Sequence, residues 1–456
     1  MMHTDRLFPP DPATRTLARS LFEGVEHLPI VSPHGHTDPA WWGDNAPFGT
    51  ATDLFVRPDH YVTRMLVSQG VPFEAFDGEP RKVWSLFARH YPLFAATPSR
   101  LWLDHAFSTV FGLTDRLREE NADAFFDTIT EALATPEFRP RALYDRFNIE
   151  VIATTDSPLD DLAHHQNAAD SDWTGRVVPT YRPDSCVDPE FDGFRNNVIR
   201  LGELTGCDTA RWQGYLEAHR RRRAFFASMG ATATDHGHPT AATLDLSEGE
   251  ASAVFQRVIR GHASPGDAET FRAQMLTEMA RMSLDDGLVM QLHAGAMRNH
   301  HAGVHRRHGR DRGFDIPTRT DFVAGLRPLL NAVGMDPRLT LILFTLDEST
   351  YARELAPLAG AYPCLKLGPP WWFHDSFEGM MRFRGQVTET AGFANTAGFN
   401  DDTRALCSIP ARHDVARRAD CAFLAGLVTT HRLDEEEAFA LAPRLATGLA
   451  REAYKL

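Results

Sequence analysis

The feature that most constrains this chain is a short apolar run, often β-branched, that recurs along it and ends each time in polar residues. Such runs are typical of buried strands, and the longer segments between them have helical periodicity. The runs cover residues 28–32, 150–155, 176–181, 231–234, 288–293, 339–345, 363–367 and 396–400. Eight parallel strands alternating with helices predict an α/β fold, a (β/α)8 barrel whose active site lies where the strands end.

The spacing of the runs is uneven. About 114 residues separate His36 from the second run at Glu150, far more than one crossover helix requires, and helix-like pieces occur at 58–69, 81–89 and 121–134. We therefore expect a helical insertion after strand one and extra helices around the barrel mouth. The predicted parts are 1–36, an N-terminal helix and first strand; 37–148, the helical insertion; and 149–456, the remainder of a metal-dependent barrel.

Charge and cysteine content exclude several classes of protein. The net charge is −14, so binding of nucleic acid by charge alone is not expected, and an anionic substrate needs locally placed arginines. Five cysteines without a CxxC pair indicate neither a disulfide framework nor a cysteine zinc site. No apolar run reaches the length of a membrane span, and the N-terminus does not resemble a signal peptide, so we expect a cytoplasmic protein without a membrane partner.

Two arginine-rich segments permit more than one interpretation. Four consecutive arginines at 220–223 lie in a helix predicted over 215–229, and we interpret them as a solvated helical face rather than an anion site. The polar loop 300–312 is compatible with a mobile lid or with plain surface.

The strongest local signal is the pair His34 and His36 at the end of the first run. Side chains two apart on a strand point the same way, so both imidazoles can reach one metal ion. A second pair, His236 and His238, follows a weaker run, and a structural histidine explains His236 equally well. The first pair is therefore the better candidate for metal ligands.

Further candidates follow other runs. Asp401 and Asp402 follow the eighth run, where a carboxylate would face the same mouth as the first histidine pair, although alone they would be loop or capping residues. His293 ends the fifth run and is a candidate ligand or proton carrier, with a structural role as the alternative. Trp371 and Trp372 follow the seventh run and can wall a sugar pocket, or only pack a loop.

Candidates for binding an anion and moving a proton also occur. Arg182 and Arg404 follow the third and eighth runs, and a guanidinium group matches a carboxylate bidentately, although each could instead form a structural ion pair. Asp59 has the position of a helix N-cap. His60 and Tyr61 come next, and both can act as acid or base if that helix covers the barrel mouth.

Together these motifs resemble the uronate isomerase family of the amidohydrolase superfamily. The resemblance spans most of the chain and rests on segments 34–39, 59–64, 154–158, 179–184, 235–237, 291–299, 371–372 and 402–404. It implies that His34, His36 and Asp402 hold one divalent ion, usually Zn²⁺ with Mn²⁺ or Fe²⁺ as alternatives, and that no organic cofactor is needed. It also implies a set of residues that contact a sugar acid, namely His60, Tyr61, Arg182 and Arg404, with the two tryptophans as further binding candidates.

The reaction implied is the aldose–ketose isomerisation of hexuronic acids, from D-glucuronate to D-fructuronate or D-galacturonate to D-tagaturonate, through an enediolate. The candidate proton carriers are Asp402, Tyr61, His60 and His293. A cation-bound carboxylate is a weak base, so the choice among them stays open. The alternatives are a mononuclear amidohydrolase, disfavoured because the sixth run ends without a histidine, and a non-catalytic sugar-binding barrel. A homo-oligomer is compatible with the sequence.

Overall fold

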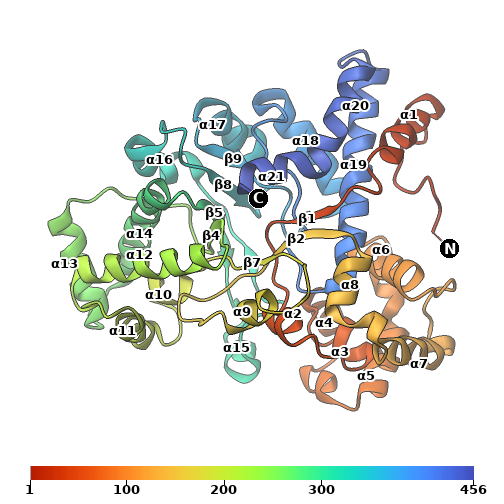
Figure 1. Cartoon of the computed structure of the whole chain (residues 1–456), viewed down its shortest axis with the longest axis horizontal. Helices are drawn as coiled ribbons and strands as arrows, with labels where there is room; N and C mark the ends of the chain where they lie inside the picture. Colours follow the sequence, from red (N-terminus) through yellow and green to blue (C-terminus); the bar gives the residue numbers. More distant parts are fainter. Residues whose placement is uncertain (1) are drawn as a thin grey trace.

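The computed structural model describes residues 2–456, and the chain forms an α/β fold with two parallel sheets (Figure 1). The first sheet contains β1 (Ile30–Ser32), β2 (Ile149–Ala153) and β3 (Val177–Val178), in that order. The second contains β4 (Ala233–His236), β5 (Val289–Ala294), β8 (Leu341–Thr345) and β9 (Leu365–Leu367). Every neighbouring pair in these two sheets is parallel.

Single bridges connect these sheets and extend them. Tyr181 pairs in parallel with Asp156 on one side and with Thr234 on the other, so the first sheet continues into the second. Leu367 of β9 pairs in the same sense with Thr396. Each of the eight predicted runs thus contains a strand or a bridge, and the runs lie side by side in chain order. The predicted α/β fold is confirmed.

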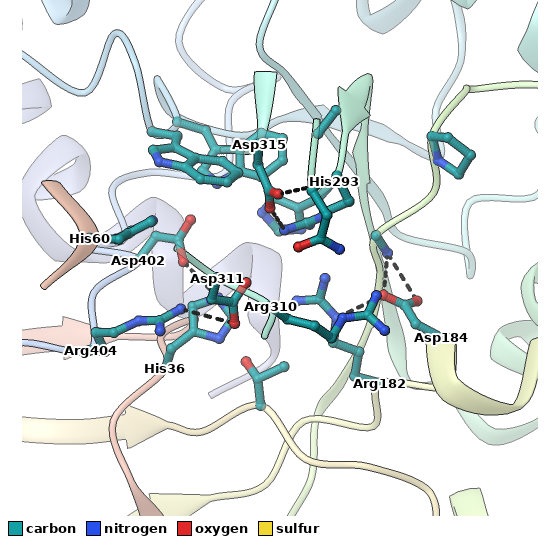
Figure 2. A pocket seen from close by; sticks show the side chains of 18 of the residues that line it. His36, His60, Arg182, Asp184, His293, Arg310, Asp311, Asp315, Asp402 and Arg404 are labelled. Atoms are coloured by element: carbon teal, nitrogen blue, oxygen red, sulfur yellow. Dashed lines mark hydrogen bonds and ion pairs between the residues drawn. The ribbon is translucent and has the colours of Figure 1, made fainter. Parts of the chain in front are cut away.

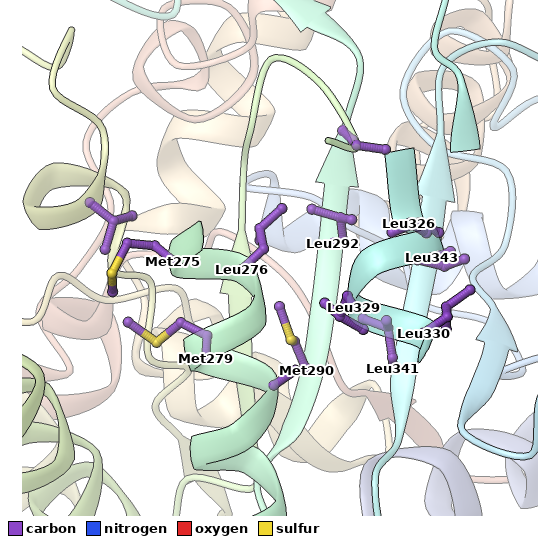
Figure 3. Packing of buried hydrophobic residues seen from close by; sticks show 14 of the residues in the cluster. Met275, Leu276, Met279, Met290, Leu292, Leu326, Leu329, Leu330, Leu341 and Leu343 are labelled. Atoms are coloured by element: carbon purple, nitrogen blue, oxygen red, sulfur yellow. The ribbon is translucent and has the colours of Figure 1, made fainter. Parts of the chain in front are cut away.

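The central strands are buried on both faces. Successive side chains along a strand point alternately into the hydrophobic core and toward the site. In β5, Met290 and Leu292 point toward the surrounding helices, whereas Gln291 and His293 have the opposite orientation. The helices that pack on this side are α14 (Pro265–Asp286) and α16 (Phe322–Val333) (Figure 3). The apolar side chains of β5 therefore fix the strand against these helices, while His293 points away from them.

The chain between β1 and β2 is helical, with its own aromatic core around Trp84, Phe87 and Phe107 (orange in Figure 1). Its α-helices are α2 (Pro39–Asp44), α3 (Ala51–Phe55), α4 (His60–Ser68), α5 (Pro80–His90), α6 (Pro98–His105), α7 (Ala122–Leu133) and α8 (Pro140–Arg146). Four of them begin with proline, whose missing N–H costs nothing at a helix start. The helices expected at 58–69, 81–89 and 121–134 are confirmed as α4, α5 and α7, and the three-part division of the chain stays a prediction.

The remaining helices surround the sheets. They are α1 (Pro12–Glu23), α9 (Ala163–Ala169), α10 (Asp184–Val187), α11 (Phe194–Thr205), α12 (Trp212–Ser228), α13 (Glu248–Ile259), α15 (Ala302–His308), α17 (Ala356–Ala361), α18 (Phe377–Ala391), α19 (Ile409–Thr429), α20 (Glu435–Pro443) and α21 (Leu449–Tyr454). Among residues 2–456, no helix is long and apolar enough to cross a membrane.

Two features differ from the expectations. The loop predicted at 300–312 contains α15, and it is flanked by a short antiparallel pair, β6 (Ala296–Met297) and β7 (Ile316–Pro317), which is too short to show any periodicity. The arginine block of α12 was interpreted as a solvated face, and this is wrong for Arg223. That side chain is fully buried, and its charge is compensated there because the guanidinium donates to both carboxylate oxygens of Asp286 and to Ser283 Oγ.

Candidate active site

A cavity of about 700 Å³ brings all the predicted site residues together (Figure 2). Its lining includes His34, His36, His60, Tyr61, Arg182, His293, Trp371, Trp372, Asp402 and Arg404. These side chains come from the ends of β1 and β5, from segments after Tyr181, β9 and Thr396, and from the start of α4. The cavity thus lies where the strands end, as the sequence predicts.

Both histidines after β1 face one oxygen of Asp402. His34 Nε2 lies 3.3 Å and His36 Nε2 lies 3.1 Å from Asp402 Oδ1. The loops meet because the backbone N–H of His36 donates to the carbonyl of Thr403 at 3.0 Å. Asp402 itself adopts a left-handed backbone conformation, with φ of 40°, which is uncommon for a non-glycine residue.

This cluster fits a divalent cation. The ligand atoms of His34, His36 and Asp402 all lie within 4.8 Å of one another. Asp402 Oδ1 is buried and has no hydrogen-bond donor in the described chain, although two imidazole nitrogens face it. Two imidazoles and a carboxylate are ligands that Zn²⁺ and the neighbouring divalent transition metals accept. A bound cation would resolve this otherwise unsatisfied arrangement.

His293 lies next to the cluster and is fixed by a carboxylate. Its Nδ1 lies 2.6 Å from Asp235 Oδ1, and its ring stacks on His34 at 4.6 Å and on Phe344 at 3.9 Å. Burial lowers the pKa of His293, so the ring is neutral at pH 7. If Nδ1 carries the proton and donates it to Asp235, the lone pair is on Nε2, which has no partner in residues 2–456. His293 can therefore act as a ligand or as a proton acceptor.

The two predicted arginines differ in how far they are already paired. Arg182 donates from Nε to Asp184 at 2.9 Å and from Nη1 to Asp235 at 2.8 Å, so it forms the structural ion pairs that were the alternative for this residue. Arg404 has one ion pair within the described chain, to Asp311 at 3.7 Å (Figure 2). The guanidinium of Arg404 is thus the more available for an anionic ligand.

The start of α4 presents His60 and Tyr61 to the cavity. Asp59 caps the helix as predicted, because its Oδ1 accepts from the backbone N–H of Tyr61 at 2.8 Å. Burial, with the charge of Arg404 adding to it, lowers the pKa of His60 to about 3. His60 is therefore neutral at physiological pH and a weak base.

The hydroxyl of Tyr61 has two acceptors and one proton. It lies 2.9 Å from the carbonyl of Trp372 and 3.1 Å from Asp375 Oδ2. Burial and the nearby carboxylate of Asp375 raise the pKa of Tyr61 well above its ordinary value. Tyr61 therefore keeps its proton at neutral pH, and it lines the cavity, where a bound group can reach it.

The tryptophan pair forms one wall of the cavity. Trp371 packs edge-on against His293 at 4.7 Å between ring centroids. Trp372 has a left-handed φ of 59°, and its ring centroid lies 5.3 Å from that of His60. The guanidinium carbon of Arg298 lies 5.7 Å from the Trp372 ring centroid. The pair is thus part of the cavity wall and not only of a loop.

The second histidine pair lies outside this set. His236 and His238 are buried and do not line the cavity, and His236 Nε2 lies 3.2 Å from Thr234 Oγ1. The interpretation of His236 as a structural histidine is therefore the better one.

Several lining residues received no role from the sequence. Asp184 and Arg298 line the cavity, and Asp235 lies behind Arg182 and His293; all three occur inside the motifs quoted above, and those motifs are the sequence signal for them. Asp311 and Asp315 occur in or just after the polar loop, where nothing in the local pattern marks them.

Comparison with known proteins decides the family. A family model described as glucuronate isomerase matches residues 12–447. The chain belongs to this family. A uronate isomerase of Rhizorhabdus wittichii is 63% identical over 459 residues, covering 100% of this chain and 98% of the relative. A uronate isomerase of Sphingopyxis alaskensis is also 63% identical, over 99% of this chain and 98% of its own length.

Solved structures of the glucuronate isomerase family agree with this assignment. The crystal structure of a glucuronate isomerase from Caulobacter crescentus matches with a TM-score of 0.99 and 59% identity, covering 100% of this chain and 97% of that one. A uronate isomerase structure from Thermotoga maritima matches with a TM-score of 0.94 at 28% identity, over 100% and 99% of the two chains. The resemblance seen in the sequence motifs is confirmed, and the hydrolase alternative is not favoured.

Proposed function

We propose that this chain interconverts the aldose and ketose forms of hexuronic acids, D-glucuronate with D-fructuronate and D-galacturonate with D-tagaturonate. The observation that carries the proposal is one cavity in which a histidine–carboxylate cluster lies beside a sparsely paired arginine, Arg404. Uronate isomerase is also the name of full-length relatives that are 63% identical to this chain.

We infer that His34, His36 and Asp402 hold one divalent ion, with Zn²⁺ preferred and Mn²⁺ or Fe²⁺ as alternatives, and that His293 is a further candidate ligand. When bound, such an ion supplies a Lewis acid that orients and polarises substrate oxygens. No organic cofactor is part of the proposal.

The remaining residues orient the sugar acid. Arg404 takes up the carboxylate, because a guanidinium group binds a carboxylate through charge-assisted hydrogen bonds. Arg182 contacts the substrate from the opposite side while its ion pairs hold Asp235 in place. Neutral His60 hydrogen-bonds to a sugar hydroxyl. The faces of Trp371 and Trp372 wall the pocket and exclude water.

The reaction moves two protons within one substrate. The C2 proton leaves, an enediolate forms, and a proton returns to C1, while a hydroxyl proton transfers from O2 to O1. Tyr61 carries the hydroxyl proton, because its raised pKa keeps it protonated until an oxyanion develops beside it. Asp402 and His293 are the candidates for carrying the carbon proton. His293 has the advantage of a carboxylate, Asp235, on its far nitrogen.

Incubation of the protein with each uronate, and with D-glucose as a neutral aldose, tests the proposal directly. We expect ketose from the uronates and little from glucose, and deuterium on product carbon when the solvent is D₂O. Absence of ketose from both uronates would refute the proposed function. Ketose without any label would indicate hydride transfer in place of the enediolate. His293→Gln and Asp402→Asn variants, assayed for label uptake, separate the two carbon-proton candidates.

A further inference from the structure

A buried ionic chain runs beside the cavity, centred on Arg412 in the first turn of α19. Its Nη1 donates to Asp375 Oδ2 at 2.8 Å and to the backbone carbonyl of Asp401 at 3.1 Å. Arg412 is 4% exposed and Asp375 is 7% exposed, so both bonds form away from water. The guanidinium lies 3.6 Å above the ring of Trp102, which fixes its plane.

One end of this chain reaches Tyr61. The oxygen of Asp375 that accepts from Arg412 also lies 3.1 Å from the Tyr61 hydroxyl. A tyrosine that donates its only proton to a carboxylate turns its lone pairs elsewhere. Because Tyr61 lines the cavity, its oxygen can then accept a hydrogen bond from a hydroxyl group held there.

The other end reaches the residue before Asp402. Arg412 holds the carbonyl of Asp401, and the next residue of α19, His413, lies 3.1 Å through Nε2 from Asp401 Oδ2. Two consecutive residues of one helix thus fix the peptide that precedes Asp402, whose left-handed φ of 40° needs such support.

We infer that Arg412 and Asp375 are positioning residues that fix the Tyr61 hydroxyl and the Asp402 carboxylate relative to each other for proton transfer. This inference rests on the proposed function. Arg412 lines the cavity, but its guanidinium is already paired with Asp375 and with the carbonyl of Asp401, so we expect loss of either residue to affect turnover more than affinity. Misplacement by about 1 Å of a group engaged in proton transfer costs roughly 10²-fold in rate.

The substitution Asp375→Asn tests this most directly. It keeps the shape of the side chain and removes the charge that Arg412 and Tyr61 share. We expect kcat for uronate to fall roughly 10- to 100-fold while KM and metal content stay within about threefold of wild type. Arg412→Lys, which keeps a buried cation, should retain more kcat than Arg412→Met.

A matched control excludes general destabilisation. Asp420 is also buried, lies on the same helix as Arg412, and accepts from Arg384 at 2.6 and 3.0 Å, but neither residue lines the cavity. Asp420→Asn should therefore lower the melting temperature without lowering kcat at 25 °C. Equal loss of kcat in Asp375→Asn and Asp420→Asn would overturn the inference.

A double-mutant cycle with Tyr61→Phe provides the decisive comparison. If Asp375 acts through Tyr61, Asp375→Asn should lower kcat by less than about threefold once the hydroxyl is gone. If the losses of kcat in the two single variants simply multiply in the double variant, the inference is overturned. Full kcat in Tyr61→Phe would also overturn it. In both cases the proposed function stands if the wild type makes ketose. A wild type that makes no ketose would instead refute the proposed function itself.

Discussion

The floor of the cavity and the segment at its rim are built differently. The floor consists of His34, His36, His293 and Asp402, with Asp235 behind His293, and its geometry is set by buried strands and by contacts of 2.6 to 3.3 Å. The rim segment, residues 296–317, contains β6, α15 and β7 and has exposed apolar side chains. Arg307 in this segment is 73% exposed and pairs with Glu74 at 3.0 Å. Exposed pairs of this kind contribute little stability.

The rim nevertheless contributes charge to the cavity. Asp311 faces Arg404, and Asp315 accepts from Arg298 at 3.0 Å. Asn299 and Asp311 have left-handed backbone conformations, with φ of 52° and 56°. We therefore expect the chemistry to reside on the strand ends and the rim to adjust binding and access.

Removal of a floor ligand should have the largest effect. We expect Asp402→Ala to lose the divalent ion and to lower kcat/KM by at least roughly 10³-fold, because several kcal/mol of charge stabilisation disappear with the ion. Metal analysis and the ketose assay measure both quantities. His27→Gln, on a side chain that is 89% exposed, is the control and should change neither. Retained metal and activity in Asp402→Ala would contradict the assignment of the floor.

The carboxylate behind the floor should matter next. Asp235→Asn loses the charge that orients His293 and balances Arg182. A loss of roughly 10- to 100-fold in activity or metal affinity is expected, as for carboxylates that orient metal-site histidines. Titration with the metal and steady-state kinetics check this expectation, and an unchanged variant would show that His293 does not depend on Asp235.

Arg404, which pairs with Asp311 of the rim, should distinguish anionic from neutral substrates. Arg404→Met should lower kcat/KM for uronates by about 10²-fold, the value of a charge-assisted hydrogen bond, and for a neutral aldose by far less. Parallel assays with D-glucuronate and D-glucose at elevated enzyme concentration test the difference. Equal losses with the two sugars would remove the carboxylate role from Arg404.

The smallest effect is expected at the rim. Arg307→Ala breaks only an exposed ion pair with Glu74, so kcat should stay within about twofold of wild type, and any change should appear in KM and shrink as salt is added. Kinetics at two ionic strengths measure this. A large fall in kcat would mean that the rim takes part in the chemistry and that the contrast with the floor is wrong.

Much of the floor could be predicted from the sequence because His34, His36, His293 and Asp402 each follow an apolar run. The alternation of side chains along a strand predicts that His34 and His36 point the same way. The apolar run before His293 predicts that this histidine lies at the end of a strand. The rim carries no such signal, since β6 and β7 have two residues each and Asp311 approaches Arg404 only through tertiary folding. The burial of Arg223 was missed for a similar reason, because its partner Asp286 lies 63 residues away.

We propose that two imidazoles that follow the first strand and one carboxylate that follows the last converge on a single cation. Anomalous diffraction from crystals grown with Zn²⁺, recorded on both sides of the zinc absorption edge, tests it most directly. We expect one strong peak within bonding distance of His34 Nε2, His36 Nε2 and an oxygen of Asp402. A catalytically active crystal whose cation lies elsewhere would contradict it.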